Sequence, residues 1–194
     1  YMDGSVSCNH GGTEMGQGLN TKMAQVCADG LGIGVDKVRI TATDSQKVPN
    51  ASATSASSGA DINGAAIMNA TAQMRERLKP VAARMLGCSE ADITFANSEA
   101  HGGGKSVKWE DVTKQAWLDR VGLSVTGFYM TPEIKYDFAK LNGRAFYYYC
   151  YGAAVSEVEI NTRTGEWWLK AVDIVHDVGK SINPAIDKGQ IEGA

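Results

Sequence analysis

The chain has 194 residues, of which 43% are hydrophobic and 21% are charged, and this composition is typical of a globular segment that buries a hydrophobic core. The net charge of −3 and the lack of any run of Lys or Arg argue against nucleic acid or an anionic membrane as a partner, because phosphates require clustered cations. No stretch reaches the ~20 apolar residues of a membrane span, and no secretion signal is recognisable.

The four cysteines are widely spaced and form no C-x-x-C motif: they are Cys8, Cys27, Cys88 and Cys150. This pattern favours free, mostly buried thiols in the reducing cytoplasm over a disulfide framework. The three histidines are equally scattered, and neither an HExxH motif nor a set of carboxylates at metal-ligand spacing occurs. We therefore expect that this chain does not ligate a metal ion directly.

The N-terminal part is expected to form a strand, a loop, a helix and a second strand. The dipeptide Asp3-Gly4 predicts a hairpin turn between two short strands within Tyr1–His10. The glycine-rich loop GGTEMGQG follows, and the apolar periodicity after it predicts a helix over Gly18–Leu31. A strand is expected over Lys37–Thr43, where apolar and polar residues alternate.

The small-residue stretch PNASATSASSGADING, which begins at Pro49, leads into a second predicted helix over Ser58–Leu86. Pro80 lies inside this helix and predicts a kink or a break. The apolar stripe of this helix consists of Ile67, Met74, Leu78, Val81 and Met85. A further helix is expected over Trp109–Arg120.

The C-terminal part alternates apolar and polar residues over Tyr147–Ile160 and again over Glu166–Val178. The intervening NTRTGE has turn chemistry, so these segments predict one long antiparallel hairpin. Aromatic residues of the run YYYCY are expected to pack in the core and across strands, and at least one of Trp167 and Trp168 is expected to pack. The fold class is therefore α+β, with mixed and antiparallel strands packed on two main helices and a long C-terminal hairpin.

Two loops share one design, since each delivers small residues to the start of a predicted helix. Helix N-termini offer unpaired N–H donors and a partial positive charge, which suit an anion. In the first loop, Gly16 and Gly18 would let a ligand approach the backbone, and the Gln17 amide could bind a polar heterocycle. The alternative is that the glycines form a tight turn and the serines cap a helix. Two such loops in one chain favour a ligand.

Five segments, which span nearly the whole chain in order, closely resemble the molybdenum-cofactor domain of the xanthine dehydrogenase and aldehyde oxidase family. They are GGTEMGQG from Gly11, PNASATSASSGADING from Pro49, GFYMTP from Gly127, YGAAVSEVEINTRTGE from Tyr151 and DIVHDVGKSINPAIDKGQIEGA from Asp173. The run from Phe128 to Tyr151 is most similar to the bacterial molybdenum-binding subunits of this family. The resemblance implies that residues 1–194 are a single segment of the second molybdenum-cofactor-binding domain, truncated at both ends.

The resemblance also implies a cytoplasmic molybdenum hydroxylase that oxidises purines, from hypoxanthine or xanthine to urate, with oxygen derived from water. Molybdopterin would carry the metal, and iron–sulfur and FAD groups would lie in other domains or subunits of an oligomeric enzyme. The implied cofactor-binding residues are Met15, Gly16, Gln17, Gly18, Ser55, Ala56, Ser57, Ser58, Gly59 and Gln190. Ser55 and Ala56 would also line the substrate pocket.

Two departures from the family pattern affect this interpretation. Ser55-Ala56 stands where the family commonly has Ala-Ala, and the catalytic glutamate of the family belongs to a Gly-Glu-Pro-Pro motif beyond Ala194. No catalytic residue is therefore assigned in this segment, including Glu14, Glu157, Glu159 and Glu192. The alternatives are a related aldehyde or N-heterocycle oxidoreductase and, in another class, an isolated scaffold module that has neither cofactor nor activity.

Overall fold

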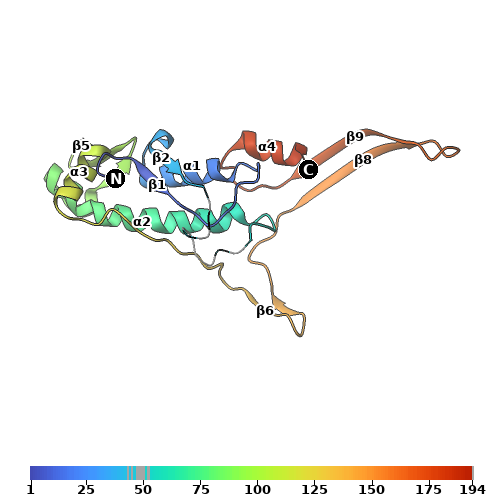
Figure 1. Ribbon diagram of the computed structural model, residues 1–194, viewed down its shortest axis with the longest axis horizontal. Coiled ribbons are helices and arrows are strands. Elements are labelled where there is room, and N and C mark those ends of the chain that lie inside the picture. Colours follow the sequence, from blue (N-terminus) through green and yellow to red (C-terminus); the bar gives the residue numbers. More distant parts are fainter. Residues whose placement is uncertain (43, 45, 47–50, 52, 194) are drawn as a thin grey trace. The chain divides into compact units, whose positions relative to one another are not determined.

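The computed structural model describes residues 1–42, 44, 46, 51 and 53–193. It divides into two compact units, Tyr1–Met130 and Thr131–Ala194. Helices and strands occur in both units, as Figure 1 shows, so the expected α+β class is confirmed. None of the helices within these described ranges is long and apolar enough to cross a membrane.

The first unit begins with strand β1 (Val6–Cys8), helix α1 (Leu19–Leu31), the 3-10 turn η1 (Val35–Lys37) and strand β2 (Val38–Ile40). Strand β1 pairs in parallel with β2, so the expected strand–loop–helix–strand unit is confirmed. The predicted strand was too long at both ends, since Lys37 belongs to the 3-10 turn and β2 ends at Ile40. Its last predicted residue, Thr43, lies outside the described residues.

The hairpin predicted around Asp3-Gly4 is wrong, because the structure has a turn there with no strand before it. The Asp3 carboxylate accepts hydrogen bonds from the Ser5 N–H at 2.9 Å and the Ser5 hydroxyl at 2.6 Å. The carbonyl of Gly4 accepts a hydrogen bond at 2.9 Å from the buried indole of Trp109. The turn is thus held by hydrogen bonds within it and by one from Trp109, and these take the place of pairing with a strand.

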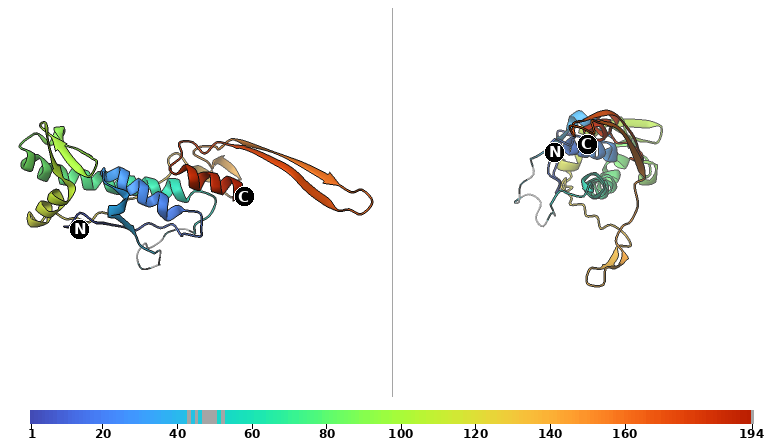
Figure 2. Two further views of the ribbon diagram at one scale, coloured as in Figure 1. Left: turned by 90° about the horizontal axis from the view of Figure 1, so that it is seen from above. Right: turned by 90° about the vertical axis from the view of Figure 1, so that its right-hand side faces the viewer.

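Helix α2 (Gly59–Leu86) packs in parallel beside α1, as the two views of Figure 2 and the contacts both show. A Cβ on Gly59 would lie 3.5 Å from Leu19, and one on Gly30 would lie only 2.4 Å from Thr71 Oγ1. The core between and around these helices includes Met23, which is fully buried. Because the helices run in the same direction, their N-terminal ends lie together.

The sequence predicted a kink or a break at Pro80. The break does not occur, because α2 continues through this residue. Proline removes the N–H that would bond the carbonyl of Glu76, but Glu76 lies on the exposed side of the helix, where water can satisfy that carbonyl. Leu78 and Val81, on either side of the proline, are fully buried and anchor the helix. The predicted stripe is wrong at Met85, which is 39% exposed.

The remainder of the first unit contains elements that the sequence did not predict. After the 3-10 turn η2 (Glu90–Asp92), strands β3 (Thr94–Ala96), β4 (Glu99–Gly102) and β5 (Lys105–Lys108) form an antiparallel sheet. The predicted helix follows as α3 (Trp109–Leu118). Its first residue, Trp109, packs edge-on against Phe95 of β3 with ring centroids 5.9 Å apart, which joins the helix to the sheet.

An extended segment returns from α3 along the surface of α2. Side chains at four-residue intervals on α2 hold it: Arg77 donates to the carbonyls of Gly122 and Ser124 at 2.7 and 2.8 Å. One turn earlier Gln73 bonds the next part of the segment at 3.4 Å, and Asn69 accepts from the Phe128 N–H at 3.3 Å. The segment therefore runs antiparallel to α2, from its C-terminal half toward its N-terminal half.

The second unit contains the short hairpin β6 (Lys135–Asp137) and β7 (Asn142–Arg144), the long hairpin β8 (Gly152–Ile160) and β9 (Trp167–His176), and helix α4 (Pro184–Gly193). The pairing of β8 with β9 confirms the predicted hairpin. The strand predicted from Tyr147 is wrong at its start, because β8 begins at Gly152. The tyrosines of YYYCY precede β8 and are exposed, so their predicted core role is wrong.

A β-bulge at Lys170 keeps one face of the long hairpin apolar. Val158 pairs with Leu169 while Glu157 pairs with Ala171, so Lys170 has no partner in the register. In β9 the apolar residues alternate at positions 167 and 169 and then at 172 and 174, so the alternation shifts by one residue. Without the extra residue in the bulge, Val172 and Ile174 would lie on the face opposite to Trp167 and Leu169. The mainly apolar face carries Ala154, Val158, Ile160, Trp167, Leu169, Val172 and Ile174, together with Gly152, Ser156 and His176.

Both tryptophans at the hairpin turn are exposed, Trp167 by 66% and Trp168 by 49%, so the expectation that at least one packs is wrong. Every residue of β8 and β9 is exposed, which means that the apolar face has no cover within this structure.

Candidate functional site

The two small-residue loops lie side by side at the N-terminal ends of α1 and α2. The Thr13 N–H in the first loop donates a hydrogen bond at 2.8 Å to the Thr54 hydroxyl in the second. Gly12 lies against the same junction, since a Cβ there would come within 2.4 Å of Leu19 and 3.0 Å of the Asn63 amide nitrogen. The fold therefore brings together the two segments that the sequence singled out, although about 40 residues separate them.

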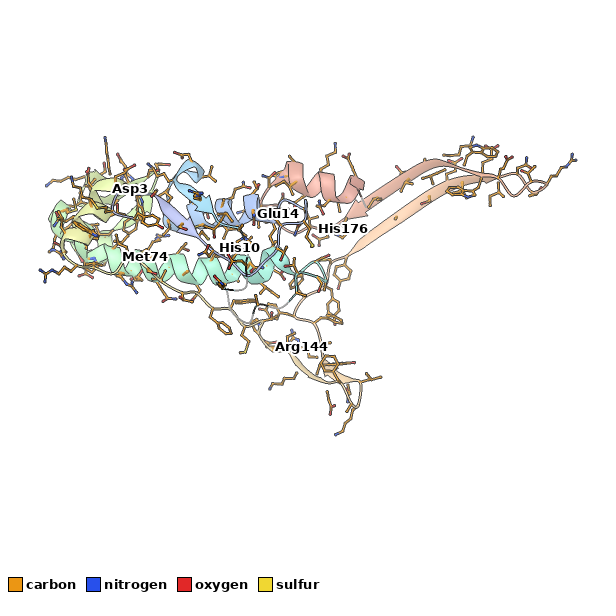
Figure 3. The ribbon with its side chains drawn as sticks, in the orientation of Figure 1. Asp3, His10, Glu14, Met74, Arg144 and His176 are labelled. Carbon is orange, nitrogen blue, oxygen red and sulfur yellow. The ribbon has the colours of Figure 1, made fainter. Side chains whose placement is uncertain are left out.

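Glu14 organises the first loop (Figure 3). Its Oε1 accepts hydrogen bonds from the N–H groups of Gly16 and Gly18 at 2.9 and 3.0 Å, and its Oε2 accepts from the Asn20 N–H at 2.8 Å. Removal from water raises the pKa of this carboxyl, but the bonds from Asn20, Gly18 and Gly16 together outweigh that effect and lower the pKa below its ordinary value. Glu14 is therefore an anion at neutral pH, held by backbone donors.

The backbone of the two glycines contributes to this arrangement. The N–H groups of Gly16 and Gly18 point toward Glu14, while the expected approach of a ligand to their backbone stays a prediction. Their φ angles of +99° and +78° lie in the left-handed region, which orients the N–H groups in this way and favours glycine. The opposite side of Gly16 is open, because a Cβ built there meets no atom within 4 Å.

The Gln17 amide is also bound within the loop. Its Oε1 accepts from the Met15 N–H at 2.6 Å, and its Nε2 donates to the Thr13 carbonyl at 2.9 Å. One Nε2 hydrogen and one oxygen lone pair remain for another partner. Met15 projects from the same loop and is 67% exposed, so its side chain is accessible to a ligand.

A buried histidine ties the start of the loop to α1. Nδ1 of His10 accepts from the Gly12 N–H at 3.1 Å, so the ring proton is assigned to Nε2, which donates to Asn20 Oδ1 at 2.9 Å. Burial lowers the pKa of His10, and the bond to Asn20 and the charge of Glu14 oppose this only in part. His10 is therefore neutral at neutral pH, and it joins the same network as Glu14 through Asn20.

The second loop carries backbone strain at the point where α2 begins. Ala56 and Ser57 both have positive φ, at 57° and 56°, a region that non-glycine residues seldom enter. Ser58 is the N-cap residue, but its hydroxyl donates to the Ser55 carbonyl at 3.2 Å and makes no capping bond to the helix. The alternative in which the serines only cap a helix is thus not supported at Ser58.

The N-terminus of α2 retains free donors. Within the part of the chain that is described, no partner is found for the backbone N–H groups of Gly59 and Ala60. The hydroxyls of Ser55 and Ser57 belong to exposed residues beside this end. An anion at the N-terminus of α2 would therefore find both N–H donors and hydroxyl groups.

Gln190 and the three other glutamates considered in the sequence analysis belong to the second unit. Gln190 and Glu192 belong to α4 of the second unit, where Glu192 pairs with Lys188 at 3.4 Å. Glu157 and Glu159 lie on the exposed strand β8, and Glu159 forms an ion pair with Lys170. Among the residues that the structure describes, no three His, Cys, Asp or Glu side chains are grouped as metal ligands. Sequence reasoning missed His10 and Asn20, although both flank the glycine-rich loop.

The first unit is thus an α+β domain that presents two small-residue loops at adjacent helix ends. A family model described as the molybdopterin cofactor-binding domain matches residues 1–194. The xanthine dehydrogenase of Oryza sativa subsp. japonica is 45% identical over 193 residues, and the xanthine dehydrogenase/oxidase of Gallus gallus is 47% identical over 194 residues. Each alignment covers 100% of this chain but only 13% of the relative.

Solved structures share this fold over the whole chain. Quinoline 2-oxidoreductase from Pseudomonas putida 86 has a TM-score of 0.77 at 30% identity, and a Cu,Mo-CO dehydrogenase has a TM-score of 0.80 at 24% identity. Each match covers 100% of this chain and 24% of the solved chain. The chain belongs to the molybdopterin cofactor-binding domain family, within the xanthine dehydrogenase and aldehyde oxidase group that its motifs predicted. The similarity to the bacterial subunits stays a prediction.

The residues present fit a phosphorylated pterin. The open side of Gly16 admits a ligand close to the backbone. The N–H groups of Gly59 and Ala60, which have no partner among the described residues, suit a phosphate at a helix end. Gln17 keeps hydrogen-bonding capacity for a heterocycle. The Glu14 carboxylate occupies the other N–H groups, so a phosphate is better accommodated at α2 than at α1.

Proposed function

We propose that residues 1–194 form a single segment of the second molybdenum-cofactor-binding domain of a larger enzyme, a hydroxylase that oxidises hypoxanthine and xanthine to urate. The chain spans 13% of the length of the xanthine dehydrogenases that it matches, and identity of 45–47% over that span supports the assignment of purines as substrates. The observation that carries the proposal is the junction of the two loops at the ends of α1 and α2. When bound, molybdopterin supplies the molybdenum and the electron transfer that hydroxylation requires.

The residues of this chain would position the cofactor and the substrate. Met15, Gly16, Gln17 and Gly18 would contact the pterin from the first loop, and Ser57, Ser58 and Gly59 would hold the phosphate at the start of α2. Ser55 and Ala56 would face both the cofactor and the substrate, and the Ser55 hydroxyl could bond a purine where an alanine could not. Gln190 would add a further pterin contact from α4. The catalytic base would be supplied by another part of the enzyme.

The same proposal sets the partners of the segment. Iron–sulfur and FAD groups, carried by other domains or subunits, would accept the electrons in an oligomeric cytoplasmic enzyme. The relatives at 24–30% identity include a quinoline oxidoreductase, so a related aldehyde or N-heterocycle oxidoreductase is the second candidate.

Cofactor and substrate are tested on the complete enzyme. Molybdenum and pterin would be quantified after purification, and steady-state rates would be compared for xanthine, hypoxanthine, quinoline and a simple aldehyde. We expect one molybdopterin per active site and the highest kcat/KM for the purines. An enzyme without molybdenum would refute the proposed function, whereas a molybdenum enzyme that prefers the aldehyde or quinoline would refute only the substrate.

A further inference from the structure

The Glu14 carboxylate sits where a bound anion would sit in the first loop. Three backbone N–H groups converge on it at 2.8–3.0 Å, from Gly16, Gly18 and Asn20. Convergent N–H groups next to a helix start form an anion seat, and here the chain fills that seat with its own side chain. The loop is thereby shaped without help from a ligand.

The same carboxylate connects the loop to the rest of the site. Asn20, which donates its N–H to Glu14, also accepts from His10, and His10 in turn accepts from the Gly12 N–H. The residue after Gly12 bonds Thr54 of the second loop. A chain of hydrogen bonds thus extends from Glu14 to both loops that would hold the cofactor.

We propose that Glu14 is a positioning residue of the cofactor site: it holds Met15–Gly18 in the binding conformation as a permanent internal anion and is not displaced by the cofactor phosphate. This inference rests on the proposed function. Glu14 is exposed, so its bonds contribute little to the stability of the core, and they act on the two loops that would hold the cofactor. An ordered loop binds more tightly because less conformational entropy is lost on binding.

The geometry favours a permanent anion over a displaced one. Expulsion of the carboxylate would break its three bonds to Gly16, Gly18 and Asn20. A phosphate has other donors, the N–H groups of Gly59 and Ala60 on the neighbouring helix, for which the described residues offer no partner. The phosphate and the Glu14 carboxylate would then occupy separate binding positions.

The test compares Glu14→Ala and Glu14→Gln in the complete enzyme with Glu76→Ala and Glu76→Gln as controls. Glu76 is an exposed glutamate on α2 that forms an ion pair with Lys79 at 2.6 Å. Molybdopterin content, the rate of cofactor loss on dilution and the thermal midpoint would be measured. We expect the rate of cofactor loss to rise about tenfold or more in both Glu14 variants, because charge-assisted hydrogen bonds are removed. The thermal midpoint of the cofactor-free protein should be unchanged.

The outcomes separate the possibilities. Unchanged cofactor content and loss rate in both Glu14 variants would overturn the inference, and slower loss from Glu14→Ala would show that the carboxylate competes with the phosphate. If Glu14→Ala is unstable, Glu14→Gln retains the shape of the side chain and decides the matter by its loss rate. A wild-type enzyme without molybdopterin would refute the proposed function itself, before any variant is compared.

Discussion

Replacement of Gly16 by valine separates a ligand-binding role of the first loop from a purely structural one. Gly16 has φ +99° and an open side where a Cβ meets no atom within 4 Å, so valine clashes with nothing in the protein. The backbone is nevertheless strained, at ~1–2 kcal/mol for a side chain in the left-handed region. A control must carry the same strain at a place remote from the loop.

Gly104 provides that control. It has φ +74°, nothing lies within 4 Å of its built Cβ, and it belongs to the turn between β4 and β5. We expect Gly16→Val and Gly104→Val to lower the thermal midpoint of the complete enzyme to a similar degree. Only Gly16→Val should lose molybdopterin, by about tenfold or more, because the branched side chain would block the approach of the ligand to the backbone at the open side of Gly16, and a loss of ~1.4 kcal/mol in binding free energy is a factor of ten.

The assay is molybdenum and pterin content per protein, together with xanthine turnover, at matched temperatures below both midpoints. Full cofactor content in Gly16→Val would refute the reasoning, and the loop would then be only a tight turn. Equal loss in both variants would attribute the effect to strain in the fold and would refute it as well.

Three further predictions follow from the structure. The lowered pKa of His10 means that the unfolded chain binds a proton that the folded chain does not, so the free energy of unfolding should fall as the pH decreases below the ordinary pKa of 6.5. His10→Asn keeps an acceptor for the Gly12 N–H and should abolish this part of the pH dependence, measured by thermal unfolding of the complete enzyme. Leu169→Lys on the apolar face of the hairpin should lower the thermal midpoint of the complete enzyme far more than Ala171→Lys on the opposite face, because we expect another part of the enzyme to cover the apolar face; equal shifts would contradict this. Residues 1–194 alone should not hydroxylate xanthine, hypoxanthine or an aldehyde even with molybdopterin and an artificial electron acceptor, since a missing general base alone typically costs ~10²–10⁴ in rate; turnover by a preparation free of the complete enzyme would contradict it.

Long periodic segments were predicted well from the sequence, and short ones were not. Helices α1, α2 and α3 lie within a residue or two of their predicted bounds, because their apolar stripes extend over several turns. Strands β3 to β7 contain three or four residues each, too few for alternation to be recognised. Helix α4 was missed although it had a signal: Asn183 accepts from the Ile186 N–H at 3.2 Å, and Pro184 occupies the first helical position.

The position of the candidate site could be predicted from the sequence, but the hydrogen-bond network within it could not. Small residues before two helices indicated both loops, since that pattern depends only on local chemistry. The role of Glu14 depends on left-handed φ angles at Gly16 and Gly18 that turn two N–H groups toward one carboxylate. The sequence alone does not show that a glutamate in a glycine-rich loop accepts hydrogen bonds from the backbone of that loop.

The meeting of the two loops depends on glycines at which α1 and α2 approach each other. Gly30 lets α1 approach Thr71 of α2 so closely that a Cβ would lie 2.4 Å from the hydroxyl oxygen, and Gly64 leaves room for Met23 at 3.7 Å. These contacts, and that of Gly59 with Leu19, follow one another in the same order along both helices, which fixes the helices as parallel. A parallel pair places both N-termini, and therefore both partial positive charges, at one end. An antiparallel pair would separate the loops by the length of a helix, so the packing of glycines in the core is a condition for the anion site at its edge.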